Sequence, residues 1–245
     1  MNDKIIGRNP VLEAIRSGRS VDKILVKKGK YEGSIVPIIK KAKDAGIIIQ
    51  EVERAKLDQI AEGENHQGVI AYVSAYDYVS VKDILDKARE KNEPPFVIIC
   101  DKITDPHNLG AILRTANCVG AHGVIIPKRN SVGLNSVVAK TSAGAVEYTP
   151  VAKVTNLGHT IDELKEQGMW FVCADMGGET MYNLNLTGPI GVVIGNEGEG
   201  VSRLIREKCD FVASIPMKGD IDSLNASVAA GVLGYEIVRQ RLQKK

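Results

Sequence analysis

Five short apolar runs set the strongest limit on how residues 96–245 can fold. They are FVIIC (96–100), GVIIP (123–127), WFVCA (170–174), IGVVIG (190–195) and FVASIPM (211–217). Each run is continuously apolar instead of alternating, which is typical of parallel strands whose two faces are both covered by helices. The stretches between them are long enough for such helices. We therefore predict an α/β fold with a doubly covered parallel sheet, and ligand-binding loops at the carboxyl ends of its strands.

The chain before Phe96 has a different pattern. It alternates short helices with short strands, with helices expected at 9–18, 34–45 and 55–61 and strands at 23–28, 46–52 and 68–75. Ser80 and Asp83 form a capping box that begins one further helix. We therefore expect a small α/β domain at 1–75, a linker with a first helix at 76–95, and a larger domain at 96–245.

Positive charge is concentrated near the N-terminus. The net charge of the whole chain is only +2, but the first thirty residues contain eight Lys or Arg and three acids. A basic patch of this kind favours a polyanionic partner such as nucleic acid, although a solvated surface is the commoner origin of a charge run. The small domain is thus a candidate nucleic-acid-binding domain.

The cysteine and histidine patterns indicate neither a disulfide framework nor a metal site. Cys100, Cys118, Cys173 and Cys209 are far apart and form no CxxC pair, so we expect buried, reduced thiols. The four histidines lack metal-ligand spacing, and we expect no structural metal. We find neither the apolar core of a signal peptide nor a run of ~20 apolar residues. The expected location is the cytoplasm, with no membrane partner.

Two loops after the apolar runs carry polar residues that suit a binding site. After FVIIC, Asn108 is expected to cap a helix that carries Arg114 on its polar side and ends at Gly120. After IGVVIG comes NEGEG, whose glycines permit close approach to a ligand and whose two glutamates suit a positively charged one. Each loop also has an ordinary explanation, because a cap with a surface charge and a tight turn are both common.

The segment 215–239 predicts a strand end, a polar turn and a long helix with Ser223 as its N-cap. Asn225 in the first turn is unusual inside a helix, although it could simply face water. The packed face of the helix is predicted to contain Leu224, Val228, Gly231, Tyr235 and Val238. Small residues at 141–145 indicate close helix packing, and residues 175–178 predict a turn.

Together these motifs are more specific than any one of them. NLGAILRTANCVGA, IGNEGEG and IPMKGDIDSLNASVAAGVLGYEI resemble the three signature motifs of the SpoU (TrmH) family of RNA ribose 2′-O-methyltransferases. GRNPVLEAI and ENHQGVIAYV are similar to the small RNA-binding domain, related to kink-turn-binding ribosomal proteins, that precedes the catalytic domain in one branch. That branch methylates a guanosine of large-subunit ribosomal RNA. The resemblance covers nearly the whole chain.

The resemblance implies properties that the patterns alone do not. The catalytic domain is expected to contain a C-terminal trefoil knot, to bind S-adenosylmethionine and to form a homodimer. The implied catalytic residues are Asn108, Arg114, Glu197, Ser223 and Asn225. The implied cofactor-binding residues are Ala174, Gly195, Asn196, Ile215, Pro216, Met217 and Leu224. The expected RNA-binding residues are Arg8, Asn9, Arg16, Lys23, Lys27 and Lys28.

Two other functions are considered. A dinucleotide-dependent oxidoreductase would suit the strand–helix alternation, but the chain lacks GxGxxG after an early strand. A catalytically silent RNA-binding dimer would use the basic N-terminal domain and the sheet as a platform. The complete polar set Asn108, Arg114, Glu197 and Asn225 favours an enzyme. We expect Arg114 to bind a phosphate and stabilise a developing alkoxide, because a guanidinium keeps its proton and makes a poor base.

Overall fold

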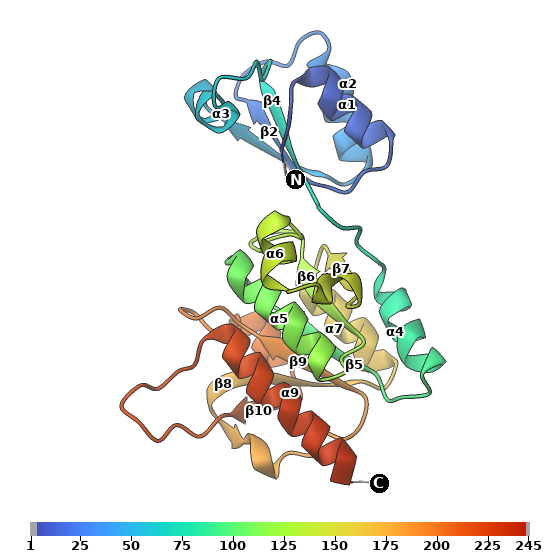
Figure 1. The fold of residues 1–245 in the computed structure, drawn as a ribbon, viewed down its shortest axis with the longest axis vertical. Helices are drawn as coiled ribbons and strands as arrows, with labels where there is room; N and C mark the ends of the chain where they lie inside the picture. Colours follow the sequence, from blue (N-terminus) through green and yellow to red (C-terminus); the bar gives the residue numbers. More distant parts are fainter. Residues whose placement is uncertain (1–3, 244–245) are drawn as a thin grey trace. The chain divides into compact units, whose positions relative to one another are not determined.

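The structure is a computed structural model that describes residues 4–243. It contains two compact units. One extends to Asp77 and includes Gly133–Ser136, and the other comprises Tyr78–Val132 and continues from Val137. Each unit has its own sheet (Figure 1).

The N-terminal unit is a four-stranded mixed sheet with helices on both faces. Its order is β1-β4-β2-β3, in which β2 is parallel to β3 and antiparallel to β4. The strands are β1 (Lys4–Ile6), β2 (Val21–Lys27), β3 (Ile48–Val52) and β4 (Val69–Val73), and the helices are α1 (Arg8–Arg16), α2 (Ile35–Asp44) and α3 (Arg54–Ala61). The expected elements are all present. The three-residue β1 was not predicted, because so short a run has no detectable period.

Two apolar clusters hold this unit together, one on each face of the sheet. Ile24 and Val26 of β2 pack against α1 and α2 around Ile38. Leu25, which points to the opposite face, packs with Leu57 of α3. This alternation follows from the two-residue period of a strand. The centre of β2, from Ile24 to Val26, is therefore buried on both sides of the sheet.

The second unit is a six-stranded sheet in which every pairing is parallel, as predicted. Its order is β10-β8-β9-β5-β6-β7. The strands are β5 (Phe96–Cys100), β6 (Gly123–Pro127), β7 (Val151–Val154), β8 (Trp170–Thr180), β9 (Ile190–Ile194) and β10 (Phe211–Ser214). All five apolar runs are strands. The edge strand β7 was not predicted, because its four residues include a lysine and are too few to form an apolar run.

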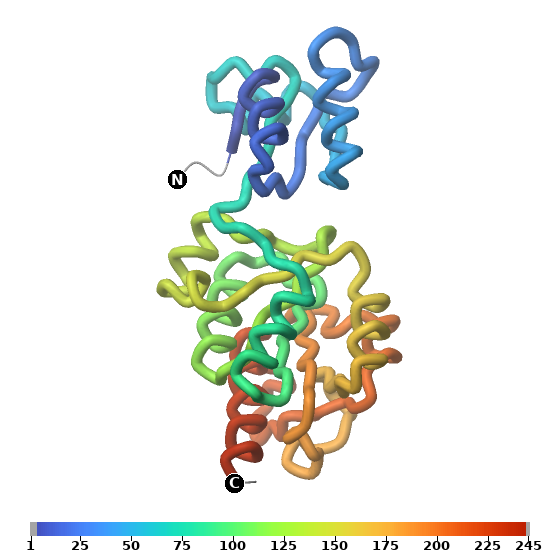
Figure 2. Tube along the Cα trace, turned by 90° about the vertical axis from the view of Figure 1, so that its right-hand side faces the viewer, coloured from blue at the N-terminus to red at the C-terminus, as the bar shows by residue number. Residues whose placement is uncertain are grey.

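Helices cover both faces of this sheet. They are α4 (Val81–Glu90), α5 (Pro106–Cys118), α6 (Ser136–Thr141), α7 (Leu157–Glu166), α8 (Arg203–Lys208) and α9 (Ala226–Gln243). One face carries α4, α7 and α8, whose apolar side chains form a cluster with Val97 and Ile99 of β5. On the other face α9 packs against α5, β8 and β9, and Figures 1 and 2 both show α9 beside α5.

Both helix starts near the candidate site differ from the prediction. Helix α5 begins at Pro106, with Asp105 as its N-cap, and Asn108 lies inside its first turn. A proline without an N–H and with a fixed φ suits the first helical position, which moves the N-cap from the expected Asn108 to Asp105, three residues earlier. Helix α9 begins at Ala226. Its cap is the side-chain oxygen of Asn225, which accepts from the backbone N–H of Ser227, and not Ser223.

The predicted packed face of α9 is also wrong. Val228 is 48% exposed and Tyr235 is 57% exposed. The buried positions are instead Ala226, Ala230, Leu233, Gly234, Glu236 and Ile237. Small residues face α5 because the two helices approach closely: a Cβ on Gly234 would lie 3.1 Å from Val119 Cγ1. Gly234 therefore permits the close approach of the two helices, while Leu233 and Ile237 are fully buried on the same helix.

Two smaller expectations are corrected. Residues 175–178 belong to the long strand β8 and do not form a turn. A Cβ on Gly178 would lie 2.2 Å from the Val212 backbone oxygen, so this strand passes β10 at a distance that only glycine allows. Cys100 and Cys173 are buried as expected, but Cys118 is exposed at the end of α5. Within residues 4–243, no helix is both long enough and apolar enough to cross a membrane.

Candidate active site

Three loops at the carboxyl edge of the six-stranded sheet bring a polar cluster together. Asn108 comes from α5, which follows β5, Glu197 from the loop after β9, and Asn225 from the segment between β10 and α9. The strands are parallel, so their carboxyl ends share one edge and side chains distant in sequence meet there. This arrangement unites three of the five residues that the sequence suggested as catalytic.

Hydrogen bonds fix the three side chains. Asn108 Nδ2 donates to Glu197 Oε1 at 3.0 Å, and Asn225 Nδ2 donates to Asn108 Oδ1 at 2.9 Å. Asn225 Nδ2 also donates to Glu197 Oε1. The Asn225 oxygen accepts from Ser227 Oγ at 2.6 Å, which sets the orientation of the amide. One carboxylate oxygen thus holds two amides, and Glu197 Oε2 keeps its lone pairs, with no partner among residues 4–243.

The structure does not bring Arg114 to this cluster. Arg114 lies six residues beyond Asn108 on α5, which places it about 240° around the helix axis. Its side chain is exposed, and it forms no ion pair within the described part of the chain. Ser223 is also outside the hydrogen-bonded cluster. It is exposed and lines the adjoining cavity.

That cavity has a volume of about 390 Å³ and is formed by β8, by the ends of β9 and β10, and by the segments that follow β9 and β10. Six of the seven residues proposed from sequence to bind a cofactor line it: Ala174, Gly195, Asn196, Ile215, Met217 and Leu224. Pro216 does not line it and is exposed. Glu197 lines it as well, so the polar cluster adjoins the cavity through this one residue. The volume lies within the range of small-molecule sites.

The cavity wall is acidic. It includes the carboxylates of Asp175, Glu197, Glu199 and Asp222, and none of its residues in the described chain is Lys or Arg. Asp175 is partly neutralised from behind by Arg206, whose Nε lies 2.8 Å away. Asp175 and Asp222 were not predicted as site residues. Asp175 directly follows the apolar run WFVCA, and this position was a signal that could have identified it. Asp222 lies in the long segment between β10 and α9, where the sequence carries no such signal.

The loop after β9 is held in a folded-back shape. A Cβ on Gly195 would lie 2.0 Å from the carbonyl carbon of Gly200, so the two ends of the loop touch. Asn196 Oδ1 accepts from the N–H groups of Gly198 and Glu199 at 3.1 and 2.7 Å. Lys102 Nζ lies 2.6 Å from Glu199, and this hydrogen bond lowers the pKa of the exposed Glu199 carboxyl. The loop is therefore prepared before any ligand binds.

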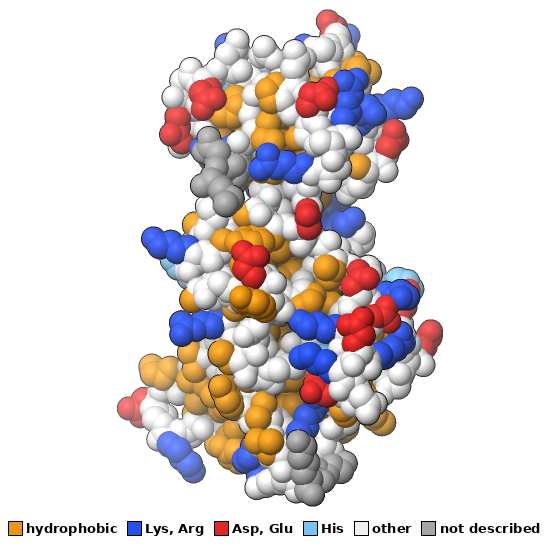
Figure 3. Space-filling model, turned by 45° about the vertical axis from the view of Figure 1, so that its right-hand side comes forward, with side chains coloured by type: hydrophobic (Ala, Val, Ile, Leu, Met, Phe, Trp, Pro, Cys, Tyr) orange, Lys and Arg blue, Asp and Glu red, His pale blue; other side chains and the backbone are white. Residues whose placement is uncertain are grey.

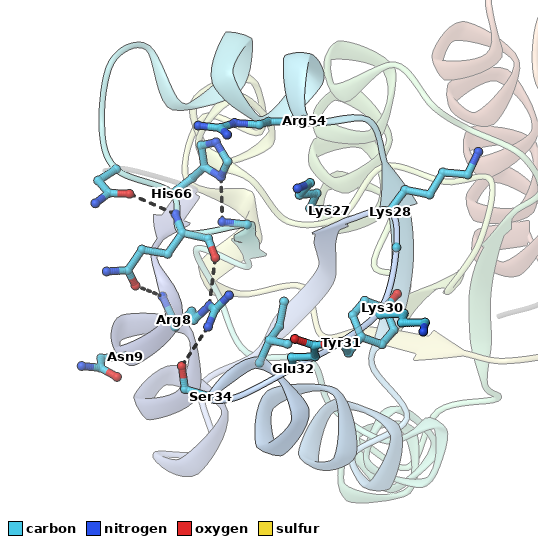
Figure 4. A pocket seen from close by; sticks show the side chains of 15 residues that line it. Arg8, Asn9, Lys27, Lys28, Lys30, Tyr31, Glu32, Ser34, Arg54 and His66 are labelled. Carbon is cyan, nitrogen blue, oxygen red and sulfur yellow. Dashed lines mark hydrogen bonds between the residues drawn. The ribbon is translucent and has the colours of Figure 1, made fainter.

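The N-terminal unit contains a separate basic groove of about 820 Å³. Figure 4 shows Arg8 on one side of it and Lys28 and Lys30 on the other. Arg8 is fixed by two hydrogen bonds, from Nε to the Gln67 backbone oxygen at 2.9 Å and from Nη1 to Ser34 Oγ at 3.1 Å. Its remaining guanidinium donors are available to an anion.

Four of the six proposed RNA-binding residues line this groove: Arg8, Asn9, Lys27 and Lys28. Arg16 and Lys23 do not. Arg16 is paired with Glu13 at 2.6 Å, and the Lys23 ammonium lies 4.8 Å from the centre of the Tyr72 ring. The groove also contains cations that the sequence analysis did not select, Lys30 and Arg54. Their closeness depends on the fold, since Arg54 begins a helix that follows a different strand.

Two family models match the chain. The one described as SpoU rRNA Methylase family matches residues 95–235, and the one described as RNA 2′-O ribose methyltransferase substrate binding matches residues 4–79. A Bacillus subtilis (strain 168) relative with the provisional name TrmH family tRNA/rRNA methyltransferase YacO is 50% identical over 241 residues, which cover 98% of this chain and 96% of the relative. A Staphylococcus aureus (strain MSSA476) relative with the same provisional family name is 48% identical over 238 residues, covering 97% and 96%.

Solved structures of SpoU methyltransferases are also similar to this chain. The SpoU methyltransferase AviRb from Streptomyces viridochromogenes, in complex with AdoMet, matches with a TM-score of 0.63 and 25% identity over 98% of this chain and 90% of its own. A TrmH/SpoU tRNA modifying enzyme from A. aeolicus matches with a TM-score of 0.56 and 30% identity over 66% of this chain and 85% of its own. No match supports an oxidoreductase among these relatives. With a family model over more than half its length and a half-identical relative over nearly all of it, the chain belongs to the SpoU rRNA methylase family.

Proposed function

We propose that this RNA methyltransferase transfers a methyl group from S-adenosylmethionine to the 2′-hydroxyl of a ribose in RNA. The observation that carries the proposal is the cluster of Asn108, Glu197 and Asn225, whose Glu197 also lines an acidic cavity. A cofactor in the cavity and a ribose at the cluster would lie side by side. Holding two reactants in this way can remove about 7–11 kcal/mol from a barrier.

The cavity fits S-adenosylmethionine, the cofactor of SpoU methyltransferases. When bound, it supplies an electrophilic methyl group on a positively charged sulfonium. Acidic residues suit that charge, while Ile215, Met217 and Leu224 offer an apolar surface to the adenine. The close backbone at Gly195 leaves no room for a side chain and exposes main-chain groups to the ligand. AviRb binds AdoMet in a related fold, which supports the same assignment here.

The polar cluster positions the ribose. Glu197 Oε1 holds both asparagine amides, and its free oxygen can accept a hydrogen bond from a ribose hydroxyl. The Asn225 amide is oriented by Ser227 and cannot rotate without losing its helix cap. Arg114 would bind the adjacent phosphate and stabilise the developing alkoxide. Ser223 would contact the cofactor or ribose from the cavity rim.

A homodimer would supply Arg114 to the site of the partner subunit. Within one chain Arg114 is far around α5 from Asn108, yet it is exposed on a helix that packs against α9. Helix α9 also exposes the large apolar side chains of Val228 and Tyr235, which favours a protein interface on this helix. Figure 3 shows exposed hydrophobic side chains in several places, with charged ones between them. In a two-fold dimer the same face serves both subunits.

The dimer proposal predicts complementation between two inactive variants. Arg114→Ala and Asn225→Ser should each be inactive, while mixed dimers should contain one intact site. Random mixing makes about half of the dimers mixed, so about a quarter of wild-type activity should return. Cofactor binding by each variant, measured by calorimetry, serves as the folding control. Failure to restore activity in mixed dimers isolated with two different tags would place Arg114 in its own subunit's site.

A trefoil knot at the C-terminus is part of the proposal. Its support is the resemblance of the signature motifs to the SpoU family and the match of residues 95–235 to that family's model. We propose further that the N-terminal unit binds the RNA and that the target is a guanosine of large-subunit ribosomal RNA. The relatives are named tRNA/rRNA methyltransferases, so transfer RNA is the competing target.

Mapping 2′-O-methyl groups tests activity and target together. RNA from cells with and without the protein would be compared, and the missing position restored with purified protein and unmodified RNA. A site in 23S RNA that depends on Asn108, Glu197 and Asn225 supports the full proposal. A transfer RNA site would correct the target alone. Absence of any methyl transfer to RNA would overturn the function.

A further inference from the structure

The geometry points to a second RNA-binding surface, located on the catalytic unit. It consists of Lys128, Arg129 and Lys140, which we call the basic rim. We propose that the basic rim binds the phosphates that flank the target nucleotide and holds its ribose at the polar cluster. This inference rests on the proposed function and adds a surface distinct from the N-terminal groove.

The basic rim lies at the same sheet edge as the polar cluster. Lys128 and Arg129 follow directly after β6, whose carboxyl end lies beside that of β5. The loop then turns back, and the Val132 N–H donates to the Ile103 backbone oxygen at 3.0 Å. Ile103 lies in the short connection from β5 to α5, which carries Asn108. The β6 loop is therefore fixed against the connection that leads into the first turn of α5.

The third residue comes from α6, which is packed against the same turn. Thr141 Oγ1, next to Lys140, lies 3.3 Å from the Pro106 backbone oxygen at the start of α5. A Cβ on Gly110 would lie 1.9 Å from that Thr141 oxygen and 3.0 Å from the Ser142 nitrogen. The end of α6 and the first turn of α5 thus touch directly. Three separate segments converge around Asn108.

The charges of the basic rim are not neutralised by the protein. Arg129 and Lys140 are exposed, Lys128 is partly exposed, and none of the three forms an ion pair within residues 4–243. Other cations of this unit do: Lys102 pairs with Glu199, Arg206 with Asp175 and Lys165 with Asp210. The neighbouring acid Asp105 serves as the N-cap of α5. Unpaired cations beside a site for RNA chemistry suit phosphate groups.

The basic rim answers a positioning problem. Phosphate contacts fix the register of a nucleic acid, and the reacting hydroxyl must be held within a fraction of an ångström. The acidic cavity cannot bind the RNA backbone itself, because its carboxylates repel phosphate. Cations set next to Asn108 on rigid elements provide the missing anchor. The acidic residues thus lie at the cofactor cavity, and the basic residues lie where the RNA backbone would bind.

The test compares two double variants of the full-length protein with the same loss of charge. Arg129→Gln/Lys140→Gln removes two rim cations, and Arg89→Gln/Lys91→Gln removes one Arg and one Lys at the end of α4 near the start of β5. We expect the rim variant to bind unmodified ribosomal RNA about tenfold more weakly, with its salt slope reduced by about 1.4 for single-stranded contacts. The control should match wild type, and S-adenosylmethionine should bind all three proteins equally.

The charge-keeping variant Arg129→Lys/Lys140→Arg separates charge from shape. This variant should regain most of the wild-type affinity for unmodified ribosomal RNA. Across the wild type and all variants, kcat/KM for the RNA should rise and fall with that affinity. Equal RNA affinity and equal salt slope for the rim and α4 variants would overturn the basic rim. The proposed function fails on a different result, namely wild-type protein that binds RNA but transfers no methyl group to it.

Discussion

Asn225 has two roles that are coupled in one side chain. Its oxygen caps α9 through Ser227, while its amide nitrogen donates to Asn108 and Glu197. A residue that is both cap and site component cannot be replaced without affecting one of the two. Because serine is also a good N-cap but cannot donate across to the cluster, the two roles can be separated by substitution.

We predict that Asn225→Ser lowers the rate of methyl transfer by at least about 100-fold while the free energy of unfolding changes little. Loss of a positioned donor in an active site typically costs this much. Asn225→Ala should be equally inactive and also less stable by about 1 kcal/mol, since the cap is lost. Single-turnover assays and urea unfolding of both variants provide the comparison. Normal turnover by Asn225→Ser would leave Asn225 only its capping role.

His122 is a buried imidazole that the fold keeps neutral. Its Nδ1 accepts from the Phe96 N–H at 3.0 Å, and Nε2 lies 3.1 Å from Glu93. Burial lowers the pKa of His122 below its usual 6.5, and the nearby Glu93 only partly opposes this effect. The unfolded chain therefore binds a proton at a higher pH than the folded chain does.

Stability should accordingly fall as the pH drops below about 6.5, and His122 should contribute no pH dependence above it. Thermal unfolding between pH 8 and pH 5 would measure this. His122→Gln, which keeps an acceptor for the Phe96 N–H, should flatten the curve in that interval. A wild-type curve that stays flat, or rises, on acidification would contradict the neutral assignment.

Among the elements, helix α5 shows how close packing overrides helix propensity. Gly110 lies inside this helix, where alanine would normally be preferred by about 1 kcal/mol. A Cβ there would meet Thr141 Oγ1 at 1.9 Å and the Ser142 backbone at 3.0 Å. Backbone cannot move aside as easily as a side chain, so the steric cost exceeds the gain in propensity.

Gly110→Ala is therefore expected to destabilise the protein by about 1–3 kcal/mol. Gly158→Ala in α7 is the matched control, because its nearest neighbour is the flexible end of Lys208 at 3.0 Å. That variant should stay within about 0.5 kcal/mol of wild type. Chemical denaturation of both proteins decides the matter, and greater stability of Gly110→Ala would show that α6 is free to shift.

The elements also show what the sequence could predict. Strands β5, β6, β8, β9 and β10 were found because each contains a continuous apolar run, and β5 and β9 are buried along their whole length. Edge strands β1 and β7 were missed because they are short. The buried face of α9 was wrong because Ala and Gly pack there at close range, while Val228 and Tyr235 remain exposed. Hydrophobicity alone does not predict an interface formed by small residues.

At the scale of the whole molecule, the sequence identified the loops of the site better than their contacts. Asn108, Glu197 and Asn225 meet because all three follow parallel strands, which the apolar runs already indicated. The position of Arg114 depends on rotation around α5, and that of the basic rim on how the β6 loop folds back. Both are tertiary properties that local patterns do not contain.

The N-terminal unit offers a matched test of RNA binding. Lys27→Gln/Lys28→Gln removes two exposed cations from the groove, and Arg16→Gln/Lys23→Gln removes two that lie outside it. We expect the first pair to reduce the salt slope of RNA binding by about 1.4 and the second to change it much less. Electrophoretic or fluorescence titrations at several salt concentrations would measure both. Equal slopes would indicate diffuse attraction and no defined groove.

The coupling at Asn225 has a consequence for dynamics. Opening the first turn of α9 and releasing Asn225 from Asn108 and Glu197 are coupled, because the same side chain supports both contacts. The hydrogen–deuterium exchange rates of the backbone amides of Ser227 and Val228 therefore report on the state of the catalytic centre. A ligand that binds the Asn225 side chain should slow this exchange, and a ligand that displaces the Asn225 side chain should speed it.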